Sequence, residues 1–175
     1  AGPVYPVNLR ADRVAGRPSY RRVTDIEGAV DLAVIAVPAA SVPGVVAECA
    51  DKDVKGVVIL SAGFGEVSAE GSALEALALE TVRDHGMRMV GPNGIGVLNT
   101  AVGLNATFIP GRPVAGRVAF QSQSGGLGIA LIDWSNELEL GISSFVSVGN
   151  KADISGNDLI QYWEQDDGTD VILMY

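Results

Sequence analysis

The sequence predicts an α/β fold in which helices cover parallel β-sheets. Short apolar runs alternate with longer amphipathic runs along the chain, as expected for strands and helices that follow one another in β–α–β units. Of its 175 residues, 47% are hydrophobic but only 6% are aromatic, so the core must consist mainly of Val, Ile, Leu and Ala. Such a core is typical of parallel strands that are buried on both faces. With 19% charged residues the chain is also too apolar to be disordered.

The individual elements follow from the apolar pattern and from start signals. Ser41 and Pro43, for example, are favourable residues for the N-cap and first turn of a helix. Strands are predicted at 4–7, 32–37, 56–60, 88–90, 118–120, 143–148 and 171–174. Helices are predicted between them, at 42–50, 72–84, 126–138 and 157–165.

The pattern changes at 99–116, which contains glycines, prolines and a polar start but no helical period. We interpret residues 1–100 as one α/β unit, residues 101–113 as a linker and residues 114–175 as the first part of a second unit. The chain has no initiator Met, and the second unit stops in mid-pattern. These observations indicate a fragment of a longer protein.

Charge and cysteine content exclude several classes of function. The net charge is −9, although residues 1–22 hold five arginines against a single aspartate. An acidic body argues against nucleic acid as the principal partner, and the basic segment could either bind a small anion or be a solvated loop.

The lone Cys49 excludes an internal disulfide and a multi-cysteine metal site, and we expect no metal site. Since there is neither a long apolar stretch nor a signal peptide, we expect a cytoplasmic protein without a membrane partner.

Candidate ligand contacts lie where the predicted strands end, because ligands of open parallel sheets bind beyond the carboxyl ends of the strands. Nearly all of these segments are small, flexible and polar, which lets a ligand approach the main chain. They are residues 7–10, 37–41, 60–66, 90–96, 122–126 and 148–153.

The segment 122–126, Ser-Gln-Ser-Gly-Gly, joins a predicted buried strand to a predicted helix. Its glycines leave backbone N–H groups accessible, and the helix N-terminus adds partial positive charge at the same place. Ser122 and Ser124 place hydroxyl groups beside these donors. The segment therefore suits a phosphate or a carboxylate, although a Ser-capped turn without a ligand fits the same residues.

Five ordered motifs together resemble the NDP-forming acyl-CoA synthetases, a superfamily that includes the succinyl-CoA synthetase α-subunit and ADP-forming acetyl-CoA synthetase. They are Val-Pro-Ala-Ala at 37–40, Ser-Ala-Gly-Phe-Gly-Glu at 61–66, Gly-Pro-Asn-Gly-Ile-Gly-Val at 91–97, Ser-Gln-Ser-Gly-Gly-Leu-Gly at 122–128 and Ser-Val-Gly-Asn-Lys-Ala-Asp at 147–153. The resemblance implies a Rossmann-like CoA-binding domain without its first strand and Gly-rich loop, followed by a partial flavodoxin-like domain.

The resemblance also implies binding residues for coenzyme A. By position in the family's motifs these are Arg10, Val37, Pro38, Leu60, Ser61 and Ala62, with Asn93 facing the acyl–thioester region. An arginine suits a CoA phosphate, and the exposed backbone at 61–63 suits the pantetheine arm or the diphosphate. A turn-forming role fits Asn93 equally well.

For the second unit, the resemblance implies that Ser122, Ser124, Gly125 and Gly126 bind the phosphoryl group in transit. In the family a carboxylate, CoA and an NTP become acyl-CoA, NDP and phosphate, by way of an acyl phosphate and a phosphohistidine. The nucleotide, ATP or GTP with Mg, would bind to an ATP-grasp domain or β-subunit, and the parent protein would be an oligomer.

Some positions depart from the family pattern. The phosphohistidine is expected beyond Tyr175, and His85 is expected to be an ordinary residue at a helix C-terminus, so we expect no catalytic residue in this chain. Ile129 replaces a tyrosine near the carboxylate in succinyl-CoA synthetase, which leaves the acyl substrate open.

Two other functions remain as alternatives. Some bacterial protein lysine acetyltransferases carry the same region as an acyl-CoA sensor. An NAD-binding oxidoreductase fits less well, because the Gly-x-Gly-x-x-Gly loop and an acidic residue after the second strand are lacking.

Overall fold

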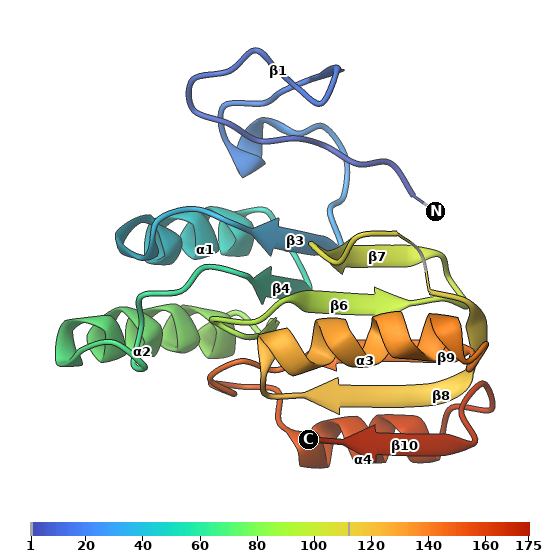
Figure 1. The fold of residues 1–175 in the computed structure, drawn as a ribbon. Helices are drawn as coiled ribbons and strands as arrows, with labels where there is room; N and C mark the ends of the chain where they lie inside the picture. The colour runs from blue at the N-terminus through green and yellow to red at the C-terminus, as the bar shows by residue number, and fades with distance from the viewer. Residues whose placement is uncertain (1, 112) are drawn as a thin grey trace.

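The structure is a computed structural model that describes residues 2–111 and 113–175. Its described residues form an α/β arrangement with one parallel sheet, one mixed sheet and a small N-terminal hairpin (Figure 1). The predicted α/β class is therefore confirmed. In the described part of the chain, no helix combines the length and apolarity that crossing a membrane would require.

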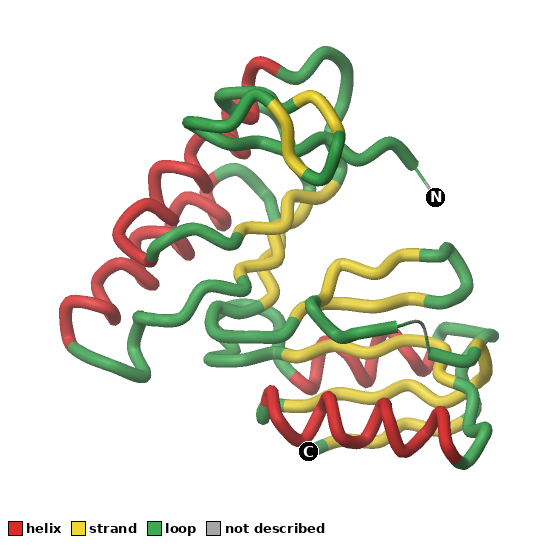
Figure 2. The backbone as a smooth tube through the Cα atoms, turned by 45° about the horizontal axis from the view of Figure 1, so that its top comes forward, coloured by secondary structure: helices red, strands yellow, loops and turns green. Residues whose placement is uncertain are grey.

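The first sheet is fully parallel and has the strand order β3-β4-β5. Its two α-helices pack against each other, and Figure 2 shows them side by side next to the sheet. The elements are β3 (Leu32–Ile35), a 3-10 helix η2 (Ala39–Ser41), α1 (Val42–Asp51), β4 (Gly56–Ile59), α2 (Ala69–Asp84) and β5 (Arg88–Val90).

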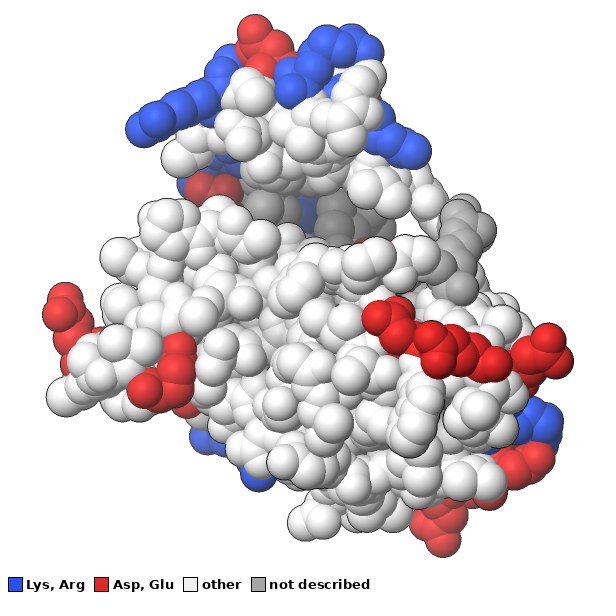
Figure 3. Space-filling model, in the orientation of Figure 1, with Lys and Arg blue, Asp and Glu red and all other residues white. Residues whose placement is uncertain are grey.

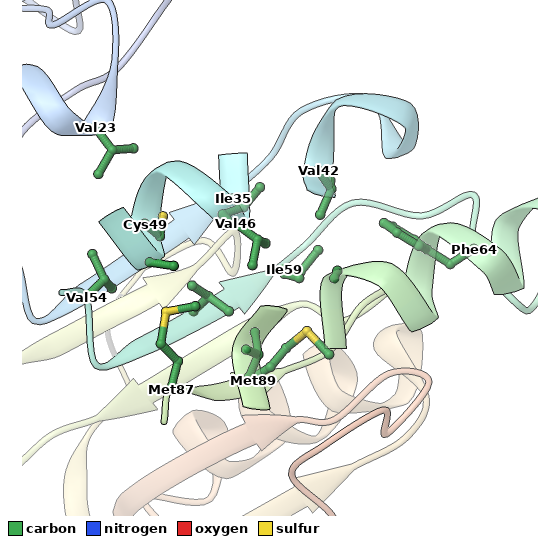
Figure 4. Packing of buried hydrophobic residues seen from close by; sticks show 14 of the residues in the cluster. Val23, Ile35, Val42, Val46, Cys49, Val54, Ile59, Phe64, Met87 and Met89 are labelled. Atoms are coloured by element: carbon green, nitrogen blue, oxygen red, sulfur yellow. The ribbon is translucent and has the colours of Figure 1, made fainter. Parts of the chain in front are cut away.

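The core of this first half lies between the sheet and the two helices. Val57 and Ile59 of β4 belong to the cluster that also contains side chains of α1 and α2. Val58, which lies between them in the strand, does not belong to this cluster. Figure 4 shows how Val46, Cys49 and Met89 converge there with Ile59. This alternation is that of a strand whose two faces meet different layers.

The second sheet has the order β10-β8-β9-β6-β7. Its β8, β9 and β10 are parallel, whereas β6 is antiparallel to β9 and to β7. The elements are β6 (Gly96–Asn99), β7 (Leu104–Thr107), β8 (Ala115–Ser122), α3 (Gly125–Glu137), β9 (Ile142–Ser147), α4 (Gly156–Glu164) and β10 (Val171–Met174).

Helices α3 and α4 cover opposite faces of this second sheet. Phe120 and Phe145 pack with Ile132 of α3 in one cluster, and Ala119 and Val146 pack with Trp163 of α4 in another. Since consecutive residues of a strand point to opposite faces, the two clusters lie on the two sides of β8 and β9. This is the layer order of a doubly wound α/β domain.

The strand predicted at 4–7 is wrong. Residues 2–6 are in no strand, and Val7 makes only an isolated bridge with Tyr20. Pro3 and Pro6 have no backbone N–H to donate, which disfavours a ladder there. The segment instead precedes a small antiparallel pair, β1 (Arg13–Val14) and β2 (Arg17–Pro18), and a 3-10 turn η1 (Val23–Asp25).

The segment 101–113, interpreted as a linker, contains a strand that the sequence did not predict, β7 at Leu104–Thr107. A hairpin places it beside β6, where Gly96 has φ +119° and a Cβ atom would lie 2.0 Å from the carbonyl oxygen of Ala106. Only glycine fits this close approach. Residues 96–99 form β6 and lie in the second sheet, with the strands of the second half of the chain. The domain bounds 1–100 and 114–175 stay predictions.

Candidate functional site

The start of α3 has the predicted strand–loop–helix form. Ser122 ends β8 and its hydroxyl donates to the carbonyl oxygen of Ser124 at 2.7 Å. Ser124 is the N-cap, and its side chain accepts from the N–H of Leu127 at 3.4 Å. Because the first N–H groups of a helix have no partner within it, Gly125 and Gly126 present theirs at the open end. Gly126 is exposed, and a Cβ atom there would meet nothing within 4 Å.

Ser147 is a further polar residue beneath this helix start, and it was not predicted as a site residue. It pairs with Ser122 across β8 and β9, so the two side chains lie on the same face of the sheet. On that face Phe145 packs so closely under α3 that a Cβ atom on Gly128 would lie 2.9 Å from its ring. The Ser147 hydroxyl is fully buried and has no hydrogen-bond partner in the described part of the chain. Only its position at the end of a predicted strand could have indicated it.

Four of the predicted CoA-binding residues lie together at the ends of β3 and β4. Val37, Leu60, Ser61 and Ala62 line an open hollow of about 420 Å³, together with Ala36 and Phe108. The Ser61 hydroxyl donates to the carbonyl oxygen of Val37 at 2.6 Å and so fixes the two strand ends relative to each other. Phe108 was not predicted as a site residue, because it lies within the predicted linker at 101–113.

Pro38, Asn93 and Arg10 do not line this hollow. Pro38 is the exposed residue before η2. Asn93 is exposed with φ +59°, and its N–H donates to the carbonyl oxygen of Ser61 at 2.9 Å. This bond attaches the loop after β5 directly to the floor of the hollow.

The side chain of Asn150, in the loop after β9, joins the two halves of the molecule. Its amide nitrogen donates to Glu66 at 2.6 Å and to Glu75 at 2.8 Å, and its amide oxygen accepts from Asn93 at 3.4 Å. The backbone N–H of Asn150 also donates to the carbonyl oxygen of Pro92 at 2.9 Å. The loops after β4, β5 and β9 are thus fixed to one another where the parallel strands end.

Glu66 is an ionised anchor within this network. Burial alone would raise its pKa, but hydrogen bonds from Asn150 and from the backbone of Gly63 and Phe64 lower the pKa to about 2. The carboxylate is therefore charged at neutral pH and holds the loop that follows Ser61.

The basic N-terminal segment contains the exposed Arg10. Figure 3 shows Lys and Arg gathered over this segment at the top of the molecule, with uncharged surface over much of the face below. Arg21 pairs with Asp12, and Arg22 lies 3.0 Å from Glu48. Arg10 is in no ion pair among the described residues, so its guanidinium group is available to a ligand.

Three residues have ordinary structural positions. His85 is exposed at the C-cap of α2, where its Nδ1 lies 2.9 Å from the carbonyl oxygen of Thr81. Cys49 is fully buried, and burial, followed by the charge of Glu48, raises the pKa of its thiol to about 11. A thiol that stays protonated is a poor nucleophile. Ile129 packs against the cluster beneath α3.

Together these residues form two neighbouring sites at the carboxyl ends of parallel strands. One is a hollow with an uncharged lining, and the other is a helix N-terminus with hydroxyl groups beside it. Such a pair suits a long ligand with an uncharged arm, together with a phosphoryl group.

Comparisons with known proteins identify relatives of both halves of the chain. Residues 1–100 match the family model of the CoA binding domain, and residues 115–175 match that of the succinyl-CoA ligase like flavodoxin domain. The chain is 46% identical over 175 residues to acetate–CoA ligase [ADP-forming] I of Archaeoglobus fulgidus, and covers 26% of that protein. It is 47% identical over 178 residues to the α-subunit of acetate–CoA ligase [ADP-forming] I of Pyrococcus furiosus, where 99% of this chain covers 38% of the subunit.

A solved structure from Ca. Korarchaeum cryptofilum has the same fold. It is a dinucleotide forming acetyl-coenzyme A synthetase 1 in complex with phosphate and ADP, 44% identical, and it superposes with a TM-score of 0.93. The match covers 98% of this chain and 36% of that one. The chain thus spans well under half the length of these relatives. The two ordered family matches show that it belongs to the NDP-forming acyl-CoA synthetases, with a CoA-binding domain followed by residues of the succinyl-CoA ligase like flavodoxin domain.

Proposed function

We propose that this chain is the CoA-binding and phosphate-binding part of an acid–thiol ligase, which converts a small carboxylate, CoA and an NTP into acyl-CoA, NDP and phosphate. The observation that carries the proposal is the hollow at the ends of β3 and β4, with the α3 N-terminus as the neighbouring site. The ADP-forming ligases that match the whole chain support it.

In this proposal the hollow holds the uncharged part of CoA against Val37, Leu60, Ser61 and Ala62. Pro38 borders the same strand end, and Arg10 binds a CoA phosphate through a charge-assisted hydrogen bond. The apolar lining offers no positive charge, so the phosphates must lie outside the hollow. The arginines of the N-terminal segment offer such charge.

Asn93 would then face the thioester, and Ser122, Ser124, Gly125 and Gly126 would bind the phosphoryl group in transit. The role of the helix end is electrostatic, because its free N–H groups and partial positive charge stabilise a phosphate without transferring a proton. The histidine that carries the phosphoryl group would lie outside this chain. ATP or GTP with Mg would bind to an ATP-grasp domain or partner subunit of an oligomeric, cytoplasmic parent protein.

Calorimetric titration of the 175-residue chain with CoA, and separately with NAD, tests the binding part of this proposal. CoA should bind at least about tenfold more tightly than NAD, a difference of about 1.4 kcal/mol. Ala62→Asp should weaken CoA binding by at least about tenfold, because a carboxylate would stand at the rim of the hollow and repel the CoA phosphates.

Ala101→Asp provides the matched control, since it adds the same charge at an exposed turn away from the lining. Preferential binding of NAD, or equal CoA affinity of the two variants, would overturn the proposal.

A further inference from the structure

Phe108 is a large aromatic side chain that remains 59% exposed at the lip of the hollow. It lies directly after β7, so it belongs to the hairpin of the second sheet, whereas the other lining residues lie at the ends of β3 and β4. An exposed aromatic ring beside an apolar hollow offers surface that a ligand could bury.

The lining has a distinct chemistry. Besides Phe108 it consists of Ala36, Val37, Leu60, Ser61 and Ala62, with no charged side chain. Its single hydroxyl, that of Ser61, already donates to Val37. What remains for a ligand is apolar surface and the backbone of two strand ends, which fits an uncharged chain with amide groups better than phosphates.

The position of the hollow indicates which part of CoA would occupy it. Its floor at Ser61 is bonded to Asn93, and the next residue, Gly94, lies against Ser147 beneath the start of α3. The hollow therefore adjoins the loop that leads to the proposed phosphate site. The part of CoA that must extend toward that site is the arm that carries the thiol.

We propose that Phe108 is a specificity-determining residue whose ring packs against the pantetheine arm of CoA. This inference rests on the proposed function. It also means that the bound arm touches both halves of the molecule, the strand ends of the first sheet and the hairpin of the second.

The experiment compares Phe108→Ala and Phe108→Leu with the unchanged chain, using CoA and adenosine 3′,5′-bisphosphate as calorimetric probes. The second probe contains the nucleotide end of CoA but lacks the pantetheine arm. Phe108→Ala should bind CoA about tenfold to a hundredfold more weakly through loss of buried apolar surface. Phe108→Leu should recover part of that loss, and the affinity for the bisphosphate should stay unchanged.

Val102→Ala is the matched control, because Val102 is also an exposed apolar residue of the same hairpin but does not line the hollow. If the unchanged chain binds CoA and Phe108→Ala binds it equally well, the inference is wrong while the CoA site stands. An equal loss for both probes also overturns the assignment to the arm. If the unchanged chain does not bind CoA, the proposed function fails with it.

Discussion

The carboxylate of Glu66 organises the loop after β4 by accepting hydrogen bonds from three directions. Gly63 and Phe64 donate from the backbone at 2.6 and 3.2 Å, and Asn150 donates from the other half of the molecule at 2.6 Å. Each of these bonds favours the ionised form, which is why the pKa of Glu66 falls to about 2. Because its pKa is lower in the folded protein, the ionisation of Glu66 is coupled to the stability of the fold.

Glu66→Gln should make thermal stability less dependent on acid pH. The folded-state pKa lies below the ordinary value of 4.5, so the carboxylate stabilises the fold above about pH 4.5 and loses that contribution as the pH falls to about 2. Glutamine does not titrate, and the drop in Tm over this window should therefore be smaller in the variant. Melting followed by circular dichroism between pH 5 and about pH 2 measures it.

Glu80→Gln removes an exposed carboxylate of α2 and serves as the control. If Glu66→Gln and Glu80→Gln give the same slope of Tm against pH, the hydrogen bonds of Glu66 do not contribute as argued.

Among the helices, the 16-residue α2 begins at an N-cap whose side chain bonds to the first turn. Ser68 lies in extended backbone before the helix, and its hydroxyl accepts from the N–H of Gly71 at 3.0 Å. Ser68→Ala removes that acceptor and should lower the free energy of unfolding by about 1 kcal/mol. Urea denaturation checks the value, and Ser68→Asp, which keeps an acceptor, should restore most of it.

Ser72→Ala, one turn further along the same helix, is the comparison. Ser72 is exposed and its hydroxyl donates back to the carbonyl oxygen of Ser68, so its loss removes no cap. A Ser68→Ala variant as stable as Ser72→Ala would show that the start of α2 is held by packing alone.

The elements differ in how well the sequence predicted them. All four α-helices and six of the seven predicted strands are present, with bounds shifted by at most three residues. The β6–β7 hairpin was missed, because its strands, Gly-Val-Leu-Asn and Leu-Asn-Ala-Thr, lack the continuous apolar run of the equally short β3, β4 and β10. Asparagine and glycine are typical of turns, and pairing with β9 stabilises β6 through contacts that its own sequence does not indicate.

At the scale of the whole molecule, Asn150 is one of the side chains through which the two halves share polar contacts. Asn150→Asp would replace a donor to Glu66 and Glu75 by a third carboxylate. We expect the free energy of unfolding at pH 7 to fall by about 2 kcal/mol, because hydrogen bonds to charged groups are lost and like charges repel. The loss should shrink in about 1 M salt, where exposed charges are screened. Urea denaturation at both ionic strengths measures it.

Asn157→Asp adds the same charge in the first turn of α4, where the helix dipole favours a carboxylate. It should leave the chain as stable as before or slightly more stable. An Asn150→Asp variant no less stable than Asn157→Asp would contradict the role assigned to this network.

The sequence by itself determined the α/β class, most helices and strands, and the strand-end segments in which candidate residues such as Ser61 and Ser122 lie. It could do so because burial of apolar residues has a local period, and because glycine and serine at strand ends are local signals. The tertiary structure alone decided that Phe108 lines the hollow, that Ser147 lies under α3, and that Asn150 bridges the loops. These contacts join residues more than 20 positions apart, and only the register and order of the strands bring such residues together.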